Sequence, residues 1–466
     1  DTGQRFTNAE ILDYYRSRRH PKLNENPRAR LPYRQAVDWY LDRQTKEYRQ
    51  TLETLNTSIG QPMSEQTQVA VCIPVAGHQE SKDIYRTLSQ YAKQTNVEGK
   101  PLNPANYEVL LFVNAPEGQS VSATIDEIAR FRKDYPSVPV RVATGTFQKG
   151  TVRYGAYIKY AYDLALLRAR ERQTANDIVI ATMDADTAQM DPAYLSENLR
   201  FMDDPANARF DATLAMQDFD HRVLAAYPTF MAAVRFRQYI EAQTQRGIPG
   251  WNSAERAGEH FPTIITQGRT SFIRGSTLAA VGGVNSSTPA GADKELGEMI
   301  TFARTGKFQN IPEEEYPLAY NNQSGIETNP RRELVTMLSG KLLTQPWDKF
   351  DEGELVRGKS LDELIRQSPE KPGDLNVPEL ERQINGFRSW GVNMDSYYAR
   401  RALSWMGLTE GSDYLLEKDD HGAKIKFMGD LSTLKNELVK FAEKTYEVSD
   451  RGDPTILAPQ EAPAIS

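Results

Sequence analysis

The stretch "DIVIATMDAD", residues 177–186, is a run of apolar and β-branched residues that ends in two aspartates one residue apart. A continuous apolar run of this length is typical of a strand buried on both faces, as in a parallel sheet covered by helices. Ligands of such sheets bind beyond the carboxyl ends of the strands. We therefore expect Asp184 and Asp186 to project into a binding crevice, where two carboxylates repel each other unless a cation or a retained proton offsets their charge.

Four other apolar runs have the same character and alternate with amphipathic stretches. The runs cover residues 68–75, 107–115, 138–144 and 211–219, and the helix-like stretches cover residues 81–95, 122–134, 151–172 and 192–203. Strands that alternate with helices predict an α/β domain, residues 68–335, with a mostly parallel sheet and helices on both faces.

The two flanks of this domain lack the strand pattern. Residues 1–67 and 336–453 carry charged, aromatic and aliphatic residues at helical spacing, which predicts helical N- and C-terminal extensions. Residues 454–466 are rich in Pro and Ala, and we expect a disordered tail there. We expect the extensions to pack on the α/β domain or to form a surface for a homo-oligomer or another partner.

The composition argues against several classes of protein. Of the 466 residues, 39% are hydrophobic and 26% are charged, as in soluble globular proteins. The formal net charge of −7 argues against nucleic acid as a partner. The single cysteine, Cys72, excludes a disulfide framework and a cysteine-based zinc site, so we expect it to pack in the core. Without a run of about 18 apolar residues or a leader, we expect no transmembrane segment and a cytoplasmic location.

Two chemistries suit the aspartate pair. A divalent cation with oxygen ligands would offset both charges and could bridge phosphates. Alternatively, a strand followed by Asp184, Ala185, Asp186 and Thr187 resembles the first motif of haloacid-dehalogenase-type phosphatases, which implies Asp184 as the nucleophile and Asp186 as the acid/base. That motif usually opens its domain, whereas here three predicted strands precede it.

Three segments carry a second resemblance: "VCIPVAGHQE" (71–80), "LLFVNAP" (110–116) and "MDADT" (183–187). They resemble, in this order, the opening strand and loop, the second strand and the Asp-x-Asp motif of family 2-like glycosyltransferases with the GT-A fold, which is related to the Rossmann fold. The resemblance implies a nucleotide-sugar donor and a Mn2+ or Mg2+ ion held by Asp184 and Asp186. The implied donor-binding residues of these segments are Pro74, Ala76, Glu80, Asn114 and Asp184.

Four other segments also resemble that family. "TGTFQKGTVRYGAYIKYA" (144–161) is similar to its Lys-Gly-rich turn before a helix, which implies Lys149 and Arg153 as ligands of the donor diphosphate. "GRTSFIRGSTLAAVGGVN" (268–285) resembles the segment on the acceptor side, and "IETNPRR" (326–332) resembles the segment that closes the core domain. "AGADKELGEMITFARTG" (290–306) places Asp293 where the family has its catalytic base, although Ala292 replaces the preceding Glu of the family.

The sequence thus predicts a metal-dependent glycosyltransferase that transfers a sugar with inversion to an unknown acceptor. Two alternatives stay open: a phosphatase with Asp184 as the nucleophile, and a non-catalytic nucleotide-binding scaffold, which the change at Ala292 favours. Asp293 could instead be the N-cap of the helix that follows it. His221, with Asp218 and Asp220, could line the pocket or supply a third metal ligand.

Overall fold

The computed structural model describes residues 7–148, 154–172, 176–244, 261–263, 266, 268–288, 291–308, 310–343, 370–371, 373–390, 394–420 and 422–449. The chain forms two compact units, and each is described by itself. Unit 1 comprises residues 1–185, 190–216 and 258–325, and unit 2 comprises residues 186–189, 217–257 and 326–466. The predicted tail, residues 454–466, lies outside the described residues, and the domain boundaries expected near residues 67 and 335 stay a prediction.

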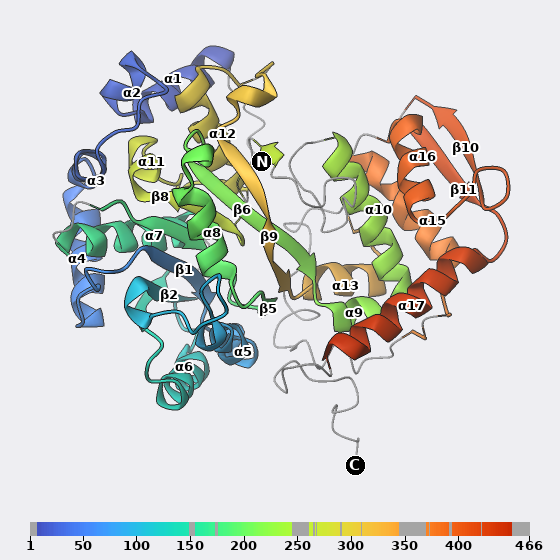
Figure 1. Ribbon diagram of the computed structural model, residues 1–466, viewed down its shortest axis with the longest axis horizontal. Helices are drawn as coiled ribbons and strands as arrows, with labels where there is room; N and C mark the ends of the chain where they lie inside the picture. Colours follow the sequence, from blue (N-terminus) through green and yellow to red (C-terminus); the bar gives the residue numbers. More distant parts are fainter. Residues whose placement is uncertain are drawn as a thin grey trace. The chain divides into compact units, whose positions relative to one another are not determined.

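The main sheet has the strand order β3-β2-β1-β4-β8-β6-β9-β5, and β7 pairs with β9 (Figure 1). Strands β1, β2, β3 and β4 are joined in parallel, whereas β8 runs antiparallel to β4 and β6, and β7 antiparallel to β9. The strands are β1 Val69–Ala76, β2 Tyr107–Pro116, β3 Val140–Phe147, β4 Val179–Thr182, β5 Thr187–Met190, β6 Ala212–Phe219, β7 Phe261–Thr263, β8 Ser271–Arg274 and β9 Leu318–Thr328.

The predicted α/β class is confirmed, and all five predicted strands are present. The sheet is mixed, however, because antiparallel strands follow the parallel half. The apolar runs did not predict β5, β7, β8 and β9. The first three of these have only three or four residues, and the middle of β9 reads "NNQSG", which lacks the apolar character of a buried strand.

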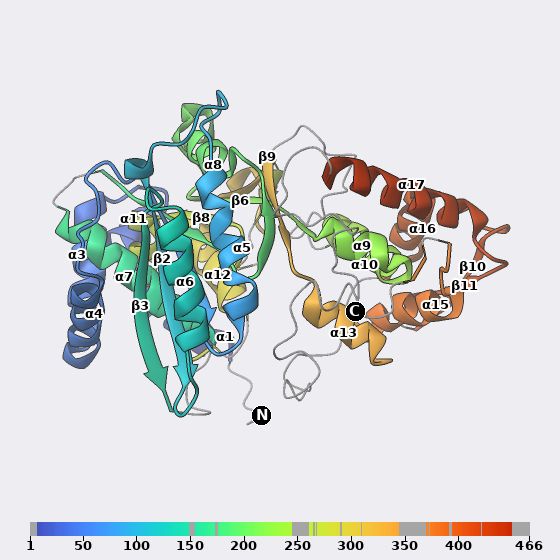
Figure 2. The same ribbon diagram turned by 90° about the horizontal axis from the view of Figure 1, so that it is seen from below.

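Helices cover both faces of the parallel half, as predicted. Figures 1 and 2 show α7 on one face and α5 and α6 on the other. Right-handed crossovers explain this, because β1, β2 and β3 progress in one direction across the sheet and α7 leads back to β4. The helices of unit 1 are α1 Asn8–Arg18, α2 Pro21–Glu25, α3 Tyr33–Asp42, α4 Lys46–Ile59, α5 Ile84–Ser89, α6 Ser122–Asp134, α7 Tyr154–Glu171, α8 Tyr194–Asp203, α11 Gly275–Ala280 and α12 Ala292–Thr305; the 3-10 helices are η1 Glu80–Lys82, η2 Tyr91–Lys93, η3 Pro104–Asn106, η4 Pro205–Asn207 and η6 Glu313–Glu315.

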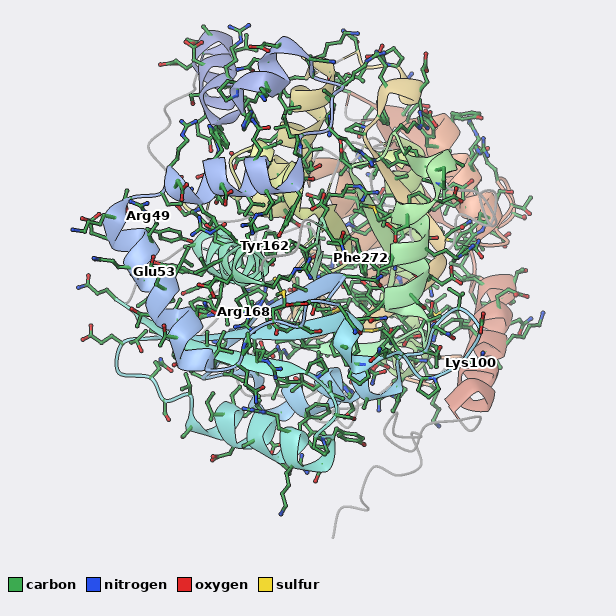
Figure 3. All side chains as sticks on the ribbon, turned by 60° about the vertical axis from the view of Figure 1, so that its left-hand side comes forward. Arg49, Glu53, Lys100, Tyr162, Arg168 and Phe272 are labelled. Carbon is green, nitrogen blue, oxygen red and sulfur yellow. The ribbon has the colours of Figure 1, made fainter. Side chains whose placement is uncertain are left out.

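The N-terminal helices pack on the α/β part of unit 1. Helix α3 contacts α7 and α11, and α4 contacts α7 and β3. The buried carboxylate of Asp163, on α7, accepts hydrogen bonds from the hydroxyls of Tyr40 on α3, at 2.8 Å, and Tyr48 on α4, at 2.9 Å. Arg49 and Glu53 point outward from α4 (Figure 3). The inner side of this extension is therefore part of the unit 1 core.

Unit 2 contains the C-terminal helices together with α9 His221–Ala226 and α10 Pro228–Thr244. Its other helices are α13 Arg331–Leu338, α15 Val377–Gly386, α16 Ser396–Trp405, α17 Ser432–Ser449 and the 3-10 helix η8 Phe387–Trp390. Helix α10 packs on α15 and α16, and α17 packs on α9. An antiparallel hairpin, β10 Tyr414–Asp419 and β11 Gly422–Phe427, was not predicted. Among the helices that the structure describes, none is long and apolar enough to cross a membrane.

Candidate active site

The turn after β4 carries Asp184. Strand β4 is buried and pairs in parallel with β1, with Thr182 opposite Cys72, which is itself fully buried as expected. Asp184 follows two residues after the end of the strand. The main-chain carbonyl of the next residue, Ala185, accepts a hydrogen bond of 2.7 Å from the hydroxyl of Thr87, which is fully buried on α5. Helix α5 therefore fixes the turn that presents Asp184 at the carboxyl end of β4.

Asp184 forms an ion pair with an arginine that the sequence analysis did not single out. The Nε atom of Arg269 lies 2.8 Å from Oδ2 of Asp184, and the two side chains are 34% and 24% exposed. A carboxylate at the end of an apolar strand needs a compensating charge or a proton. Here the guanidinium of Arg269 supplies that compensating charge.

Arg269 lies in a turn, residues 268–270, whose main chain is held on both sides. The N–H of Gly268 donates to Oδ2 of Asp293 at 2.7 Å, and the carbonyl of Thr270 accepts from the N–H of Ala215 in β6 at 3.0 Å. One residue later, the N–H of Ser271 donates to the hydroxyl of Thr182 in β4 at 3.1 Å. These bonds tie the turn directly to the end of β4, so the stem of Arg269 is fixed beside Asp184.

Asp293 and Asp184 thus contact successive residues of the same turn. Asp293 is the second residue of α12, and Gly291, with φ of 77°, is the N-cap, so the N-cap alternative for Asp293 is wrong. The hydroxyl of Thr266 donates to the main-chain carbonyl of Asp293. A position in the first turn of a helix favours negative charge, because the main-chain N–H groups there point toward it.

Two glycines allow this close packing. A Cβ atom on Gly268 would lie 2.9 Å from the hydroxyl oxygen of Tyr154 and 3.5 Å from Oδ2 of Asp293. A Cβ atom on Gly155 would lie 2.2 Å from the main-chain oxygen of Asn285. Glycine at these positions brings the start of α7 and the start of α12 together at the turn of Arg269. Tyr162, farther along α7, and Phe272, in β8, are both buried and are labelled in Figure 3.

The second aspartate of the pair, Asp186, has its own arginine. The NH2 atom of Arg331, the first residue of α13, lies 3.6 Å from Oδ2 of Asp186. The side chain of Arg331 is buried and that of Asp186 is 20% exposed. Each aspartate of the motif is therefore paired with a guanidinium of its own unit.

The predicted donor-binding residues of the first two strands lie at the carboxyl ends of those strands. Pro74 and Ala76 belong to the last part of β1, and Ala76 pairs with Asn114 in β2. Glu80 opens η1 and is buried. The side-chain amide of Asn114 donates to the main-chain carbonyls of Val75, at 3.0 Å, and Phe112, at 3.3 Å. Its N–H groups therefore hold the strand ends.

Two predicted ligands of the diphosphate, Lys149 and Arg153, lie outside the described residues. The described parts nearest to them in sequence are the end of β3 at Phe147 and the start of α7 at Tyr154. That both side chains bind the donor stays a prediction.

The acidic cluster around His221 is closed by its own ion pairs. Nδ1 of His221 lies 2.6 Å from Oε1 of Glu327, Asp218 pairs with Arg235 at 2.8 Å, and Asp220 pairs with Arg222 at 2.9 Å. Burial lowers the pKa of His221, but the hydrogen bond and the negative charge of Glu327 outweigh it, so this pKa lies above the usual value.

Within the described ranges, no three or more His, Cys, Asp or Glu side chains form a group that could hold a metal ion. A third metal ligand from His221 therefore has no support.

Sequence reasoning missed Arg269 and Arg331, although both lie in segments quoted for the resemblance. The available signal was electrostatic: each aspartate of a pair at a strand end needs a positive partner, and each of the two segments carries arginine. What the sequence could not show is which arginine reaches which aspartate, because that depends on tertiary packing.

Comparisons with known proteins complete the description. No protein-family model matches the sequence, and no curated protein matches it. Among solved structures, the chain is similar to the mannosyltransferase PcManGT from Pyrobaculum calidifontis in complex with GDP-Man and Mn2+, with 12% identity and a TM-score of 0.34 over 92% of this chain and 97% of that one.

Proposed function

We propose that this chain is a nucleotide-sugar-dependent glycosyltransferase with a GT-A-like core, which uses a divalent cation and transfers the sugar with inversion. One observation carries the proposal. Asp184, the proposed cation ligand, and Asp293, the proposed base, are far apart in the sequence but contact the adjacent residues Arg269 and Gly268. A transfer site needs both groups at one end of the sheet, so this arrangement supports it.

The carboxylates of Asp184 and Asp186 suit Mn2+ or Mg2+. Both are partly exposed oxygen donors, and Mg2+ is commonly bound by one or two carboxylates with water and substrate phosphates completing its shell. The cation, when bound, would supply positive charge to the donor diphosphate as the bond to the sugar breaks. The carboxylates themselves would hold that charge at the end of β4.

The rest of the donor site is assigned to residues at the strand ends. In the proposal, Pro74, Ala76, Glu80 and Asn114 border the nucleotide. Lys149 and Arg153 would contact the diphosphate from the segment before α7, since two cations there would neutralise its charge. These roles come from the resemblance, and the position of the first four residues at the carboxyl ends of β1 and β2 agrees with them.

Asp293 would act as the general base. One of its carboxylate oxygens accepts the N–H of Gly268, which holds the side chain in place. The other oxygen would accept the proton of the acceptor hydroxyl as that hydroxyl attacks the anomeric carbon opposite the leaving diphosphate. Displacement from the opposite side inverts the configuration at that carbon.

A donor-consumption assay tests the proposal. The protein is incubated with Mn2+ and a panel of nucleotide sugars, with pooled polar and lipid acceptors, and released nucleoside diphosphate and the anomeric configuration of the product are measured. We expect turnover with one or a few donors, an inverted product, and loss of turnover in Asp184→Asn.

Three results would contradict it. A product with the donor's configuration would exclude the role of Asp293. Hydrolysis of a generic phosphate ester that is lost in Asp184→Asn, without use of any nucleotide sugar, would favour the phosphatase. Nucleotide binding without turnover on any donor would favour the scaffold.

A further inference from the structure

The pairing of Asp184 with Arg269 differs from a purely structural ion pair in how it is held. Both side chains are partly open to solvent, at 24% for Asp184 and 34% for Arg269, and Nε of the guanidinium lies 2.8 Å from Oδ2 of the carboxylate. The main chain around Arg269 is fixed by Asp293 and by β6. The main chain on both sides of Arg269 is thus held in place, while its side chain is 34% exposed to solvent.

A guanidinium and a hard cation compete for the negative charge of the same carboxylate. With Nε of Arg269 2.8 Å from Oδ2 of Asp184, a metal ion bound to that carboxylate is repelled by the guanidinium charge, so its binding is weakened. A diphosphate offers the guanidinium an alternative, since phosphate oxygens match its fork of N–H donors. A diphosphate that arrives with the cation would therefore give each positive group its own negative partner.

We propose that Arg269 exchanges partners: it neutralises Asp184 before the donor binds, and it turns to the donor's diphosphate when Asp184 takes up the cation. This inference rests on the proposed function. Arg269 is then a positioning residue with two effects, because it weakens binding of the cation alone and strengthens binding of the cation and diphosphate together. The exchange couples the two ligands.

The coupling can be measured without any turnover. Titration calorimetry gives the affinity of Mn2+ alone, of pyrophosphate alone, and of each in the presence of the other, for the wild type and for Arg269→Gln. UDP, GDP and ADP repeat the titrations with a base attached. Arg269→Lys serves as a second variant that retains a charge, and thermal unfolding checks that each variant is folded.

Arg130→Gln is the matched control. Arg130 is exposed on α6 and pairs with Glu127 at 2.5 Å, so this change removes the same charge from unit 1 without touching the site. It should leave every affinity as in the wild type.

Arg269→Gln should change the affinities for the cation and for the diphosphate in opposite directions. In Arg269→Gln, Mn2+ alone should bind several-fold more tightly, because its competitor is gone. Pyrophosphate and the nucleoside diphosphates should bind roughly tenfold more weakly in the presence of Mn2+, because a charge-assisted contact is lost. The affinities of Arg269→Lys should lie between those of the wild type and those of Arg269→Gln, since lysine keeps the positive charge but lacks the paired N–H donors of a guanidinium.

Two results would overturn the inference. If the wild type binds Mn2+ and diphosphate while Arg269→Gln leaves both affinities and their coupling unchanged, or weakens Mn2+ alone, Arg269 does not exchange. If the wild type binds neither ligand, the proposed function fails and the inference fails with it.

Discussion

Two arginine–carboxylate pairs of unit 1 are built in opposite ways. Arg168 on α7 meets Glu108 on β2 through two bonds, at 2.7 and 2.8 Å, and it also donates to Asn56 and to the main-chain carbonyl of Gln61. Its side chain is 2% exposed. Arg269 meets Asp184 at the sheet end with both side chains partly exposed. We call the first pair closed, because both its side chains are buried, and the second pair open, because both its side chains are partly exposed to solvent.

This difference in burial distinguishes an ion pair that stabilises the fold from one that could bind a ligand. A buried guanidinium that makes four hydrogen bonds, as Arg168 does, cannot change partner without leaving a charge unpaired, which is costly. A partly exposed pair gains little stability, because water screens it. We therefore assign Arg168 to the fold and Arg269 to the site.

The largest predicted effect tests the closed pair. Arg168→Met leaves Glu108 buried beside Arg141 alone, and it should lower the free energy of unfolding by about 3–5 kcal/mol. Arg269→Met should lower it by less than about 1 kcal/mol. Urea denaturation of both variants measures the contrast. Equal losses in the two variants would break the distinction between the closed and the open pair.

The second prediction concerns the open region. Asp293→Asn should slow sugar transfer about a hundredfold or more, since the base is lost. Its stability should stay close to that of the wild type, because the amide oxygen can still accept the N–H of Gly268. Donor binding, measured by calorimetry, should not change. Near-normal transfer by this variant would remove Asp293 from the chemistry.

The third prediction concerns the packing that supports the open pair. Gly268→Ala places a Cβ atom against the hydroxyl of Tyr154, so the turn that carries Arg269 should shift and transfer should fall roughly tenfold. Tyr154→Phe removes that hydroxyl. The effect of Gly268→Ala on the transfer rate should therefore be smaller in the Tyr154→Phe background than in the wild type. A failure of this rescue would mean that the collision does not control the site.

The sequence predicted the parallel half of the sheet and the position of Asp184 because both follow from local pattern. The runs that became β1, β2, β3 and β4 are apolar and β-branched, and the end of such a strand is visible in the sequence. The hairpin of β10 and β11 lies inside residues 336–453, for which the sequence predicts only helices, although "LLEKDDHGAKIKF" contains a turn signal. Strand alternation there was the overlooked evidence.

The candidate site was predicted only in part, for a different physical reason. Asp184 could be singled out because a carboxylate at the end of a buried strand implies chemistry, and Asp293 because its segment resembles the one that carries the catalytic base in family 2-like glycosyltransferases. Their partners could not, since the contacts of Arg269 and Gly268 arise from the packing of β8, β6 and α12 against β4. A pattern shows an element, but the tertiary fold selects the partner of a charge.

The smallest predicted effect uses a pair in unit 2 as a contrast. The pKa of His221 is raised in the folded state, against the effect of burial, by Glu327, so protonated His221 stabilises unit 2. That stabilisation is present below the ordinary pKa of histidine and is lost as the pH rises through the raised value. Urea midpoints between about pH 5 and about pH 9 should show this loss in the wild type. His221→Gln should flatten it, and an unchanged pH profile in that variant would contradict the assignment.

The most direct test of the central claim is a calorimetric titration with nucleoside diphosphate, with Mn2+ and with EDTA. It compares the wild type, Asp184→Asn and the control Asp126→Asn, whose side chain is exposed on α6. If Asp184 holds the cation that binds the diphosphate, the wild type and the control should bind in Mn2+ and lose most of that affinity in EDTA. Asp184→Asn should bind weakly in both. Equal affinity in Mn2+ and EDTA, retained in Asp184→Asn, would contradict the claim.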